Sequence, residues 1–202
     1  MRLLMKIPII AKTTGGVIFL LLLIFPVKYS AAGAMNEAEL WKALKSGGHF
    51  ALIRHAVAPG TGDPPRFSLN DCRTQRNLSQ KGRRQAEEIG NRFRYYGIDT
   101  ARVYSSQWCR CLETAVLLGL GPVKQLPLLN SFFRQHEQRN EQTDKLRNWL
   151  RHQKFNDKPI VLVTHQVNIT AFAGVFPQSG EIVVVSGSNE GEFTIAGTII
   201  TD

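Results

Sequence analysis

The sequence predicts an α/β domain of three layers, in which helices cover both faces of a mostly parallel central sheet that has an antiparallel edge. Two continuous apolar runs, residues 50–53 and 160–163, each lead into a polar residue followed by a histidine. Apolar runs of this length are typical of strands buried on both faces, as in parallel sheets. Amphipathic helical patterns alternate with short strand patterns between the two runs, which predicts helices packed on a parallel sheet.

The first elements expected are a helix, a strand and a long loop. Residues 36–46 form an amphipathic helical pattern that Asn36 caps and Gly47 ends. The first buried strand covers residues 49–55. Residues 56–76 then form a loop rich in Pro, Gly, Asp and Asn. Loops of this length are unusual inside a compact domain and are typically lids or binding segments.

The elements after this loop alternate between helices and strands. Ser79 caps a helix whose apolar residues recur at spacings of three and four until Gly97 ends it. Residues 130–141 are polar and carry no clear pattern. The other expected elements are strands over 101–105, 123–129 and 159–165, helices over 108–118, 142–153 and 168–174, and two antiparallel strands over 181–185 and 192–200.

The amino-terminal segment, residues 1–34, has the pattern of a secretory signal peptide. Basic residues precede an uninterrupted apolar run over residues 17–27, and small residues follow it, with residues 32–34 as the expected cleavage site. Eleven apolar residues fall short of the about 20 that a membrane span needs, which favours cleavage. The alternative is an uncleaved anchor to the inner membrane. We therefore expect a protein exported to the periplasm, with residues 35–202 as its folded domain.

The chain is basic, with 25 Lys and Arg residues against 16 Asp and Glu residues and a formal net charge of +9. Removal of residues 1–34 would take away four basic residues and no acidic one, which leaves +5. This balance favours anionic partners, such as a small phosphorylated molecule, a phosphorylated envelope glycolipid or a membrane surface. Nucleic acid is not expected as a partner, because the basic residues are dispersed and an exported protein seldom meets it.

The three cysteines, Cys72, Cys109 and Cys111, permit one disulfide in an oxidising compartment. Cys72 would pair with Cys109 or with Cys111, because a bond between the latter two would span a single residue and be strained. The disulfide would hold the long loop over the pocket. A zinc site is disfavoured, since the paired Cys-x2-Cys spacing and a nearby histidine are both missing.

Four polar side chains are expected to converge at one edge of the sheet. Arg54 and His55 end the first buried strand, His165 ends the second, and Arg110 lies in the first turn of a helix that follows a strand. The carboxyl ends of parallel strands meet at one edge, where such sheets bind ligands. Arginine forks match phosphate oxygens, and a neutral imidazole can attack phosphorus to form a covalent intermediate. The pattern therefore predicts an oxyanion site that contains a nucleophile.

Four segments resemble motifs of the histidine phosphatase superfamily, branch one, whose fold is phosphoglycerate mutase-like. Residues 52–56 (LIRHA) resemble its Arg-His-Gly signature, and residues 78–86 (LSQKGRRQA) resemble its Leu-Ser-x-x-Gly-x-x-Gln-Ala helix start. Residues 104–115 (YSSQWCRCLETA) are similar to its Ser-Ser-x-x-x-Arg-x-x-Gln-Thr-Ala segment. Residues 161–165 (VLVTH) are similar to its late strand, which ends in Ser-His-Gly or Thr-His.

The resemblance implies a phosphoric monoester hydrolase with a phosphohistidine intermediate. His55 would be the phosphorylated nucleophile, Arg54 and Arg110 would bind the phosphate, and His165 would stabilise the transferring group. No metal or organic cofactor is expected, because the arginines supply the charge stabilisation that a metal ion gives elsewhere. In size, export signal and lack of acidic site residues the chain is similar to the superfamily's exported lipopolysaccharide-core heptose phosphatases.

The chain departs from the family pattern at three positions, Ala56 for the signature glycine, Glu113 for glutamine, and Asn130. Many branch-one members carry a general-acid glutamate after the third strand, in a Leu-x-Glu context. Here Asn130 is in that region, and an amide cannot donate a proton to a leaving alkoxide. The candidate general acids are Glu137 and Glu141, just downstream, and Asp63 and Asp71 of the long loop.

These departures keep other functions open. The alternative to an enzyme is a non-catalytic anion-binding module, which would keep the arginine pocket and lack the acid. A structural envelope protein tethered by residues 17–27 is a third possibility. A mutase is disfavoured, because it must hold its phosphorylated intermediate long enough to return the phosphoryl group.

Overall fold

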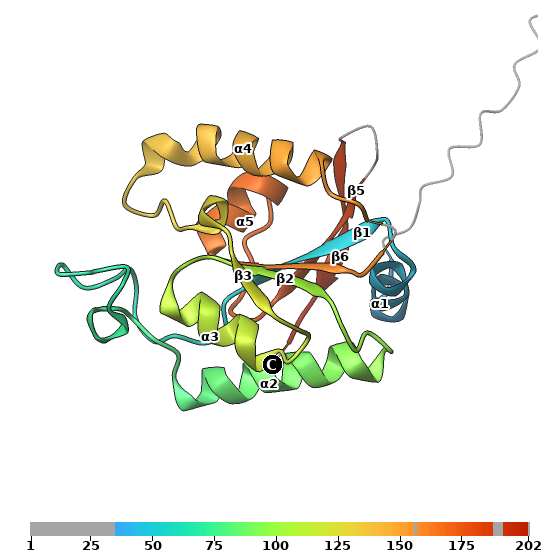
Figure 1. The fold of residues 1–202 in the computed structure, drawn as a ribbon, viewed down its shortest axis with the longest axis horizontal. Coiled ribbons are helices and arrows are strands. Elements are labelled where there is room, and N and C mark those ends of the chain that lie inside the picture. Colours follow the sequence, from blue (N-terminus) through green and yellow to red (C-terminus); the bar gives the residue numbers. More distant parts are fainter. Residues whose placement is uncertain (1–34, 156, 188–191, 202) are drawn as a thin grey trace, which may run out of the picture. The chain divides into compact units, whose positions relative to one another are not determined.

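The computed structural model describes residues 35–155, 157–187 and 192–201 (Figure 1). The segment 1–34, expected to be a signal peptide or a membrane anchor, lies outside these residues. Within the described part of the chain, no helix combines the length and the apolar character that crossing a membrane would require.

The sheet has six strands in the order β3-β2-β4-β1-β5-β6. Their bounds are β1 His49–Arg54, β2 Arg102–Ser105, β3 Val123–Gln125, β4 Ile160–Thr164, β5 Ile182–Gly187 and β6 Phe193–Ile199. The neighbours β3, β2, β4 and β1 all run parallel, whereas β5 pairs antiparallel with both β1 and β6. This arrangement confirms the prediction of a mostly parallel sheet with an antiparallel edge.

Helices cover both faces of this sheet. Their bounds are α1 Glu37–Ser46, α2 Gln80–Tyr95, α3 Cys109–Leu117, α4 Arg139–Arg151 and α5 Gln166–Ala173. Figure 1 shows α4 and α5 on one side of the sheet and α2 and α3 on the other. Alternate residues of β1 face opposite layers, since Ala51 and Ile53 pack in the core with α1, α2 and α3, whereas Phe50 and Leu52 pack with α4 and α5. The three predicted layers are therefore confirmed, and the two-sided burial explains the continuous apolar run.

The helix boundaries follow the predicted capping residues. Asn36 and Glu39 form a reciprocal capping box at the start of α1. The Ser79 hydroxyl accepts the backbone N–H of Gly82 at 3.0 Å and so begins α2. Gly97, just after α2, has φ 76°, a left-handed conformation that favours glycine and ends the helix.

Two predicted elements differ from the structure. The stretch 123–129, expected as one strand, is a strand only over its first three residues and continues as the 3-10 turn η2, Pro127–Leu129. Pro127 has no N–H with which to continue a strand ladder. α4 begins three residues earlier than expected and follows a second turn, η3, His136–Gln138. The first turn of α4 is exposed and polar, so it has no apolar periodicity in the sequence.

The start of α2 packs tightly against the chain that leaves β1. A Cβ atom on Gly82 would lie 2.1 Å from the carbonyl oxygen of Val57. The same carbonyl accepts the backbone N–H and the hydroxyl of Ser79, at 3.0 and 3.2 Å. Gly82 therefore allows the start of α2 to approach the backbone of Val57, two residues after the predicted nucleophile His55.

We predict that Gly82→Ala lowers the free energy of unfolding by about 1–3 kcal/mol, because the added methyl group must displace backbone. In an open helix the same change is stabilising by about 1 kcal/mol, so the sign is informative. Urea unfolding measures the effect. Arg84→Ala, at an exposed position of the same helix, is the control and should change stability by less than about 0.5 kcal/mol. A gain in stability for Gly82→Ala would contradict the close approach.

Candidate active site

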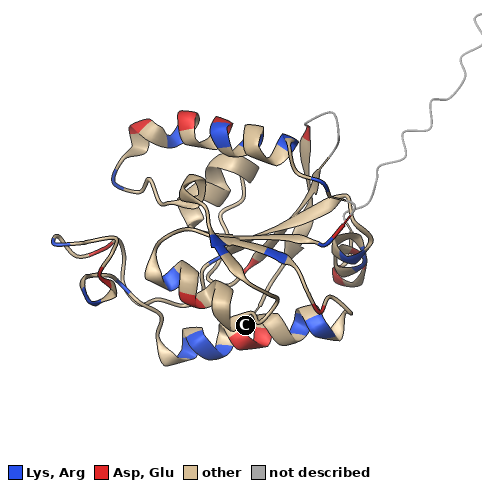
Figure 2. Cartoon of the chain, in the orientation of Figure 1, with Lys and Arg blue, Asp and Glu red and all other residues tan. Residues whose placement is uncertain are grey.

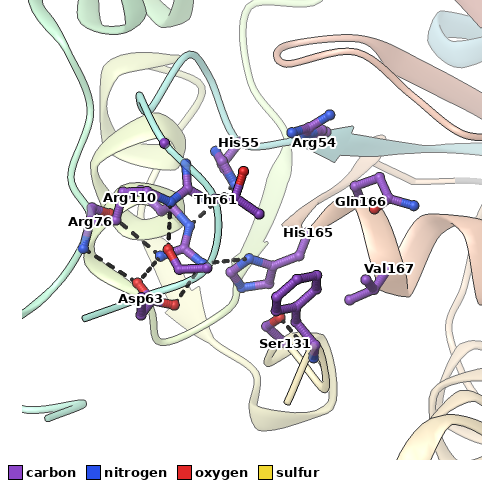
Figure 3. A pocket seen from close by; sticks show the side chains of 13 residues that line it. Arg54, His55, Thr61, Asp63, Arg76, Arg110, Ser131, His165, Gln166 and Val167 are labelled. Atoms are coloured by element: carbon purple, nitrogen blue, oxygen red, sulfur yellow. Dashed lines mark hydrogen bonds and ion pairs between the residues drawn. The ribbon is translucent and has the colours of Figure 1, made fainter. Parts of the chain in front are cut away.

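A small pocket opens at the carboxyl edge of the parallel strands. Arg54, the last residue of β1, lies beside Thr164, the last residue of β4, in the sheet register. A histidine follows each strand directly, His55 after β1 and His165 after β4. The pocket has a volume of about 110 Å³. Its titratable lining residues are Arg54, His55, Asp63, Arg76, Arg110 and His165. Figure 3 shows Asp63 and Arg76 on one side of His165, and Gln166 and Val167 on the other.

The buried guanidinium of Arg110 connects the groups of this pocket. Arg110 is only 3% exposed, and it lies at the start of α3, directly after Cys109. Its Nε donates to Nε2 of His55 at 3.2 Å, and one Nη donates to Nδ1 of His165 at 3.3 Å. The two Nη atoms also contact the two carboxylate oxygens of Asp63, at 2.7 and 3.2 Å. Arg110 therefore contacts both histidines and a carboxylate at once.

The hydrogen bonds of His55 define its tautomer. Its Nδ1 lies 2.8 Å from the carbonyl oxygen of Ala56, and a carbonyl can only accept, so Nδ1 carries the proton. Its Nε2 faces the Arg110 Nε–H, which can only donate. The lone pair of Nε2 therefore points to the Arg110 side of the pocket, as a nucleophile requires.

Burial and positive charge keep His55 neutral. Burial, followed by the charges of Arg110, Arg76 and Arg54, lowers the pKa of His55 to about 3, despite the opposing hydrogen bond to Ala56. Burial and the same arginines also lower the pKa of His165 well below its ordinary value. Both imidazoles are thus neutral at neutral pH, with one protonated ring nitrogen each.

His165 is positioned by a chain of hydrogen bonds that ends at Asn130. Because Nδ1 of His165 accepts from Arg110, its Nε2 carries the proton and donates to the Ser106 hydroxyl at 2.9 Å. That hydroxyl donates to Oδ1 of Asn130 at 3.3 Å, and Oδ1 also accepts the backbone N–H of Gln107 at 2.9 Å. Asn130 is therefore a positioning residue, which gives a structural reason for an amide in this region.

Three arginine side chains line the pocket. Burial and the charge of Arg110 lower the pKa values of Arg54 and Arg76. Arg54 donates one Nη–H to the carbonyl of Pro177 at 2.9 Å, while its buried Nε has no hydrogen-bond partner in the described part of the chain. Three guanidinium groups thus face one carboxylate among the described lining residues. This imbalance favours a bound dianion.

Asp63 supplies that carboxylate. Its side chain is 13% exposed and also accepts the Trp108 indole N–H at 3.0 Å and the backbone N–H of Arg76 at 3.3 Å. Burial raises the pKa of Asp63, but the hydrogen bonds and charge of Arg110, together with the bond from Trp108, outweigh it and lower the pKa overall. Asp63 is therefore ionised while it remains paired with Arg110.

The other candidate acids do not line the pocket. Glu137 is exposed in the turn η3, and Glu141 is exposed on α4, where it bonds Lys145. Asp71 caps the short turn η1, Cys72–Thr74, and bonds Arg73. Proximity to Asn130 in the sequence thus does not bring Glu137 or Glu141 to His55, because the chain turns away to begin α4. Neither carboxylate is therefore placed to protonate a leaving group at His55.

The disulfide pairs Cys72 with Cys109, which resolves the alternative left open by the sequence. It ties the long loop to the residue that precedes Arg110. Gln75 supports the same connection, because its side-chain oxygen accepts the backbone N–H of Cys109 at 3.0 Å. Cys111 is a buried thiol whose pKa burial raises to about 12, so it is unreactive as a nucleophile. Within the described residues, no three His, Cys, Asp or Glu side chains gather as metal ligands.

Two further departures from the family pattern have structural explanations. All described residues with positive φ are glycines, so Ala56 occupies a conformation that suits an alanine. Its N–H donates to the Thr114 hydroxyl at 3.1 Å. Glu113 pairs with Arg83 of α2 at 2.6 Å and is not among the pocket's lining residues.

Sequence reasoning missed Arg76, Thr61 and Gln166, all of which line the pocket. Arg76 and Thr61 come from the long loop, where no periodicity or spacing marks a functional residue. The unusual length of the loop was the only signal available. Gln166 follows His165 directly and could have been inferred from that position.

The fold and the pocket define a class of phosphoryl-binding α/β protein with a histidine at the carboxyl edge of its sheet. Residues 50–159 match the family model of the histidine phosphatase superfamily (branch 1), and the chain belongs to this superfamily. The predicted family and enzyme class, a phosphatase of the histidine type, are thereby confirmed. No protein of curated function matches the sequence.

Solved structures with the same fold include three phosphatases. The protein histidine phosphatase SixA, complexed with tungstate, has a TM-score of 0.53 at 14% identity, over 75% of this chain and 96% of that one. A phosphoserine phosphatase from Entamoeba histolytica with 3-phosphoglyceric acid has 0.57 at 14% identity, over 76% and 98%. A mycobacterial glucosyl-3-phosphoglycerate phosphatase with VO3 has 0.56 at 15% identity, over 73% and 96%. These likenesses confirm the phosphoglycerate mutase-like fold.

We predict that the free energy of unfolding falls as the pH is lowered from 7 to 5. In this window the unfolded chain protonates His55 near its ordinary pKa of 6.5, whereas the folded chain keeps it neutral down to about pH 3. The unfolded state then binds more protons, so stability is lost, by roughly 2 kcal/mol for this one imidazole. Asp63 does not contribute, because it stays ionised in both states above pH 5.

Urea unfolding at several pH values measures this slope. His55→Gln should make the slope shallower, since it removes one of the two buried imidazoles. His152→Gln, at an exposed position after α4, is the matched control and should keep the wild-type slope. An unchanged slope in His55→Gln would show that His55 is not held neutral by burial.

Proposed function

We propose that the chain hydrolyses phosphomonoesters through a phosphohistidine on Nε2 of His55. The observation that carries this proposal is the unprotonated Nε2 of a buried imidazole, facing a pocket with three guanidinium groups. A neutral imidazole is a competent nucleophile, and the guanidinium groups stabilise the charge of the transferring phosphoryl group.

The reaction has two displacements. Nε2 of His55 attacks phosphorus, the P–N bond forms, and the ester P–O bond breaks as the leaving oxygen departs with its electron pair. The Nδ1–H of the resulting imidazolium remains bonded to the Ala56 carbonyl, which stabilises the positive charge. Water then attacks phosphorus, the P–N bond breaks, and inorganic phosphate is released. Arg110 and Arg54 bind the phosphoryl oxygens in both steps, and His165 holds Arg110 beside them by accepting one of its Nη–H groups at Nδ1.

We propose Asp63 as the proton donor to the leaving oxygen. A phosphate that binds Arg110 competes with the Asp63 carboxylate for the same Nη atoms. Once displaced, the carboxylate loses its cation and lies beside a dianion, and both changes raise its pKa. A protonated Asp63 gives its proton to the leaving oxygen, and the carboxylate then accepts a proton from the attacking water.

The substrate is a small phosphorylated molecule or a phosphorylated envelope glycolipid. Two of the solved relatives support the first class by name, one as a phosphoserine phosphatase and the other as a glucosyl-3-phosphoglycerate phosphatase. Nucleic acid is disfavoured by the distribution of charge, since the basic side chains are spread over several helices and strands with acidic side chains among them (Figure 2). The remaining excess of basic residues suits association with an anionic membrane surface.

We further propose that the protein works outside the cytoplasm, in the periplasm. The signal-like pattern of residues 1–34 supports export, and the Cys72–Cys109 disulfide is consistent with an oxidising compartment. The alternative location is the outer side of the inner membrane, with residues 17–27 retained as an anchor.

We predict that the full-length chain hydrolyses p-nitrophenyl phosphate and that His55→Ala lowers kcat/KM at least about 1000-fold, because the nucleophile is lost. Release of p-nitrophenolate measures turnover. Rapid quench with radiolabelled phosphate ester should trap an acid-labile, alkali-stable phosphoenzyme in the wild type alone. His152→Ala, an exposed histidine, is the control and should keep wild-type turnover. Phosphate binding without turnover would favour the anion-binding module instead.

We also predict that Asp63→Asn separates substrates by leaving group. Hydrolysis of ethyl phosphate should fall about 100-fold or more, because an alkoxide needs a proton. Hydrolysis of p-nitrophenyl phosphate should fall much less, because p-nitrophenolate leaves unprotonated. Steady-state kcat values for the two esters test this difference.

Glu137→Gln and Glu141→Gln are the controls and should change neither rate, because both side chains are exposed and outside the pocket. A rise in both rates for Asp63→Asn would show that the carboxylate only blocks Arg110. An equal fall for both esters would show that it acts by positioning Arg110 and not by donating a proton.

A further inference from the structure

A second cavity adjoins the phosphate pocket. It has a volume of about 290 Å³ and shares Asp63, Ser131 and Phe133 with that pocket. Phe67 and Trp108 form its other aromatic wall. The reaction proposed above assigns no role to these aromatic rings.

Aromatic rings line much of this cavity. Phe67 and Trp108 stack with their centroids 5.1 Å apart and their planes 19° apart. The Trp108 indole N–H already donates to Asp63, so the indole offers mainly its carbon surface. Phe133 is 42% exposed although it is large and apolar. Half-exposed aromatic rings around one cavity are suited to bind a flat apolar partner.

We propose that this aromatic cavity, lined by Phe67, Trp108 and Phe133, is the subsite for the leaving group and takes a ring-bearing alcohol. The inference rests on the proposed hydrolysis and adds the class of the ester. Phosphate in the small pocket and a ring in the aromatic cavity would place the ester oxygen between them. Asp63 lines both cavities, so its carboxyl would lie beside that oxygen.

The two cavities differ in chemistry as well as in size. The smaller one is lined by three guanidinium groups, whereas Arg134 is the single cation lining the larger one in the described part of the chain. Arg134 bonds the backbone carbonyl of Asp63 and so holds the loop between the cavities. Ser131 and Gln135 supply polar groups for hydroxyls. The shared ligand chemistry is therefore a ring with one flat apolar face, either an aromatic ring or a sugar.

Binding of non-hydrolysable phosphonates tests this subsite without relying on turnover. We measure Kd on the full-length chain for ethyl-, cyclohexylmethyl- and benzylphosphonate by titration calorimetry. The wild type should bind at least one ring compound about tenfold more tightly than ethylphosphonate. Phe133→Ala should reduce this ratio to about threefold or less. Tyr95→Ala, an exposed aromatic of α2 far along the chain from the cavity, is the control and should keep the wild-type ratio.

The two ring compounds distinguish the sources of the ring. Tighter binding of benzylphosphonate alone indicates an aromatic leaving group, and tighter binding of both indicates that a saturated ring such as a sugar also fits. Equal Kd values for all three compounds in the wild type, or an unchanged ratio in Phe133→Ala, would overturn the subsite. The proposed hydrolysis is tested separately. If the protein does not turn over benzyl phosphate or glucose 6-phosphate, the hydrolysis proposal fails, while the ratio of the phosphonate Kd values can still support the subsite.

Discussion

The contact set of Arg110 is the interaction on which the site depends. A buried guanidinium is costly unless acceptors surround it, and here the acceptors are two imidazole nitrogens and a carboxylate. Because a guanidinium can only donate, it requires each histidine to turn an unprotonated nitrogen toward it. One buried cation thus orients His55, His165 and Asp63, and its charge adds to burial in keeping the proposed nucleophile neutral. The charge that would stabilise the phosphoryl group in the proposed reaction therefore also orders the free site.

Arg110 also links the binding of a phosphate to the protonation state of Asp63. In the free protein its Nη atoms are occupied by Asp63, so the pocket is internally neutralised in part. A phosphate dianion is a stronger acceptor than a carboxylate and competes for those atoms. In the proposed mechanism, exchange of one anion for another changes the environment of the released carboxylate, so substrate binding itself would generate the acid. A site without a dedicated glutamate can in this way obtain a proton donor from its loop.

The sheet and its histidines could be predicted because strand burial and strand direction are visible in the sequence. The apolar runs that end at His55 and His165 place both at one edge, and Arg110 follows from the helix that begins after β2. Asp63 could be named only as one of four candidate acids, and Arg76 was missed, because the path of the long loop depends on tertiary contacts such as those of Gln75 and the disulfide. Glu137 and Glu141 show the converse, since nearness in sequence to Asn130 is lost where α4 begins.

The Cys72–Cys109 disulfide makes assembly of this site depend on the surroundings of the chain. It fastens the loop that carries Asp63 to the residue before Arg110, the two ends of the central ion pair. Where thiols are kept reduced, only non-covalent contacts, such as the ion pair itself and the bond from Trp108, hold that loop. Where thiols are oxidised, the disulfide confines the carboxylate and the arginine to one neighbourhood. In the export proposed above, oxidation of these two cysteines would therefore act as a maturation step that fixes the loop beside Arg110 after synthesis.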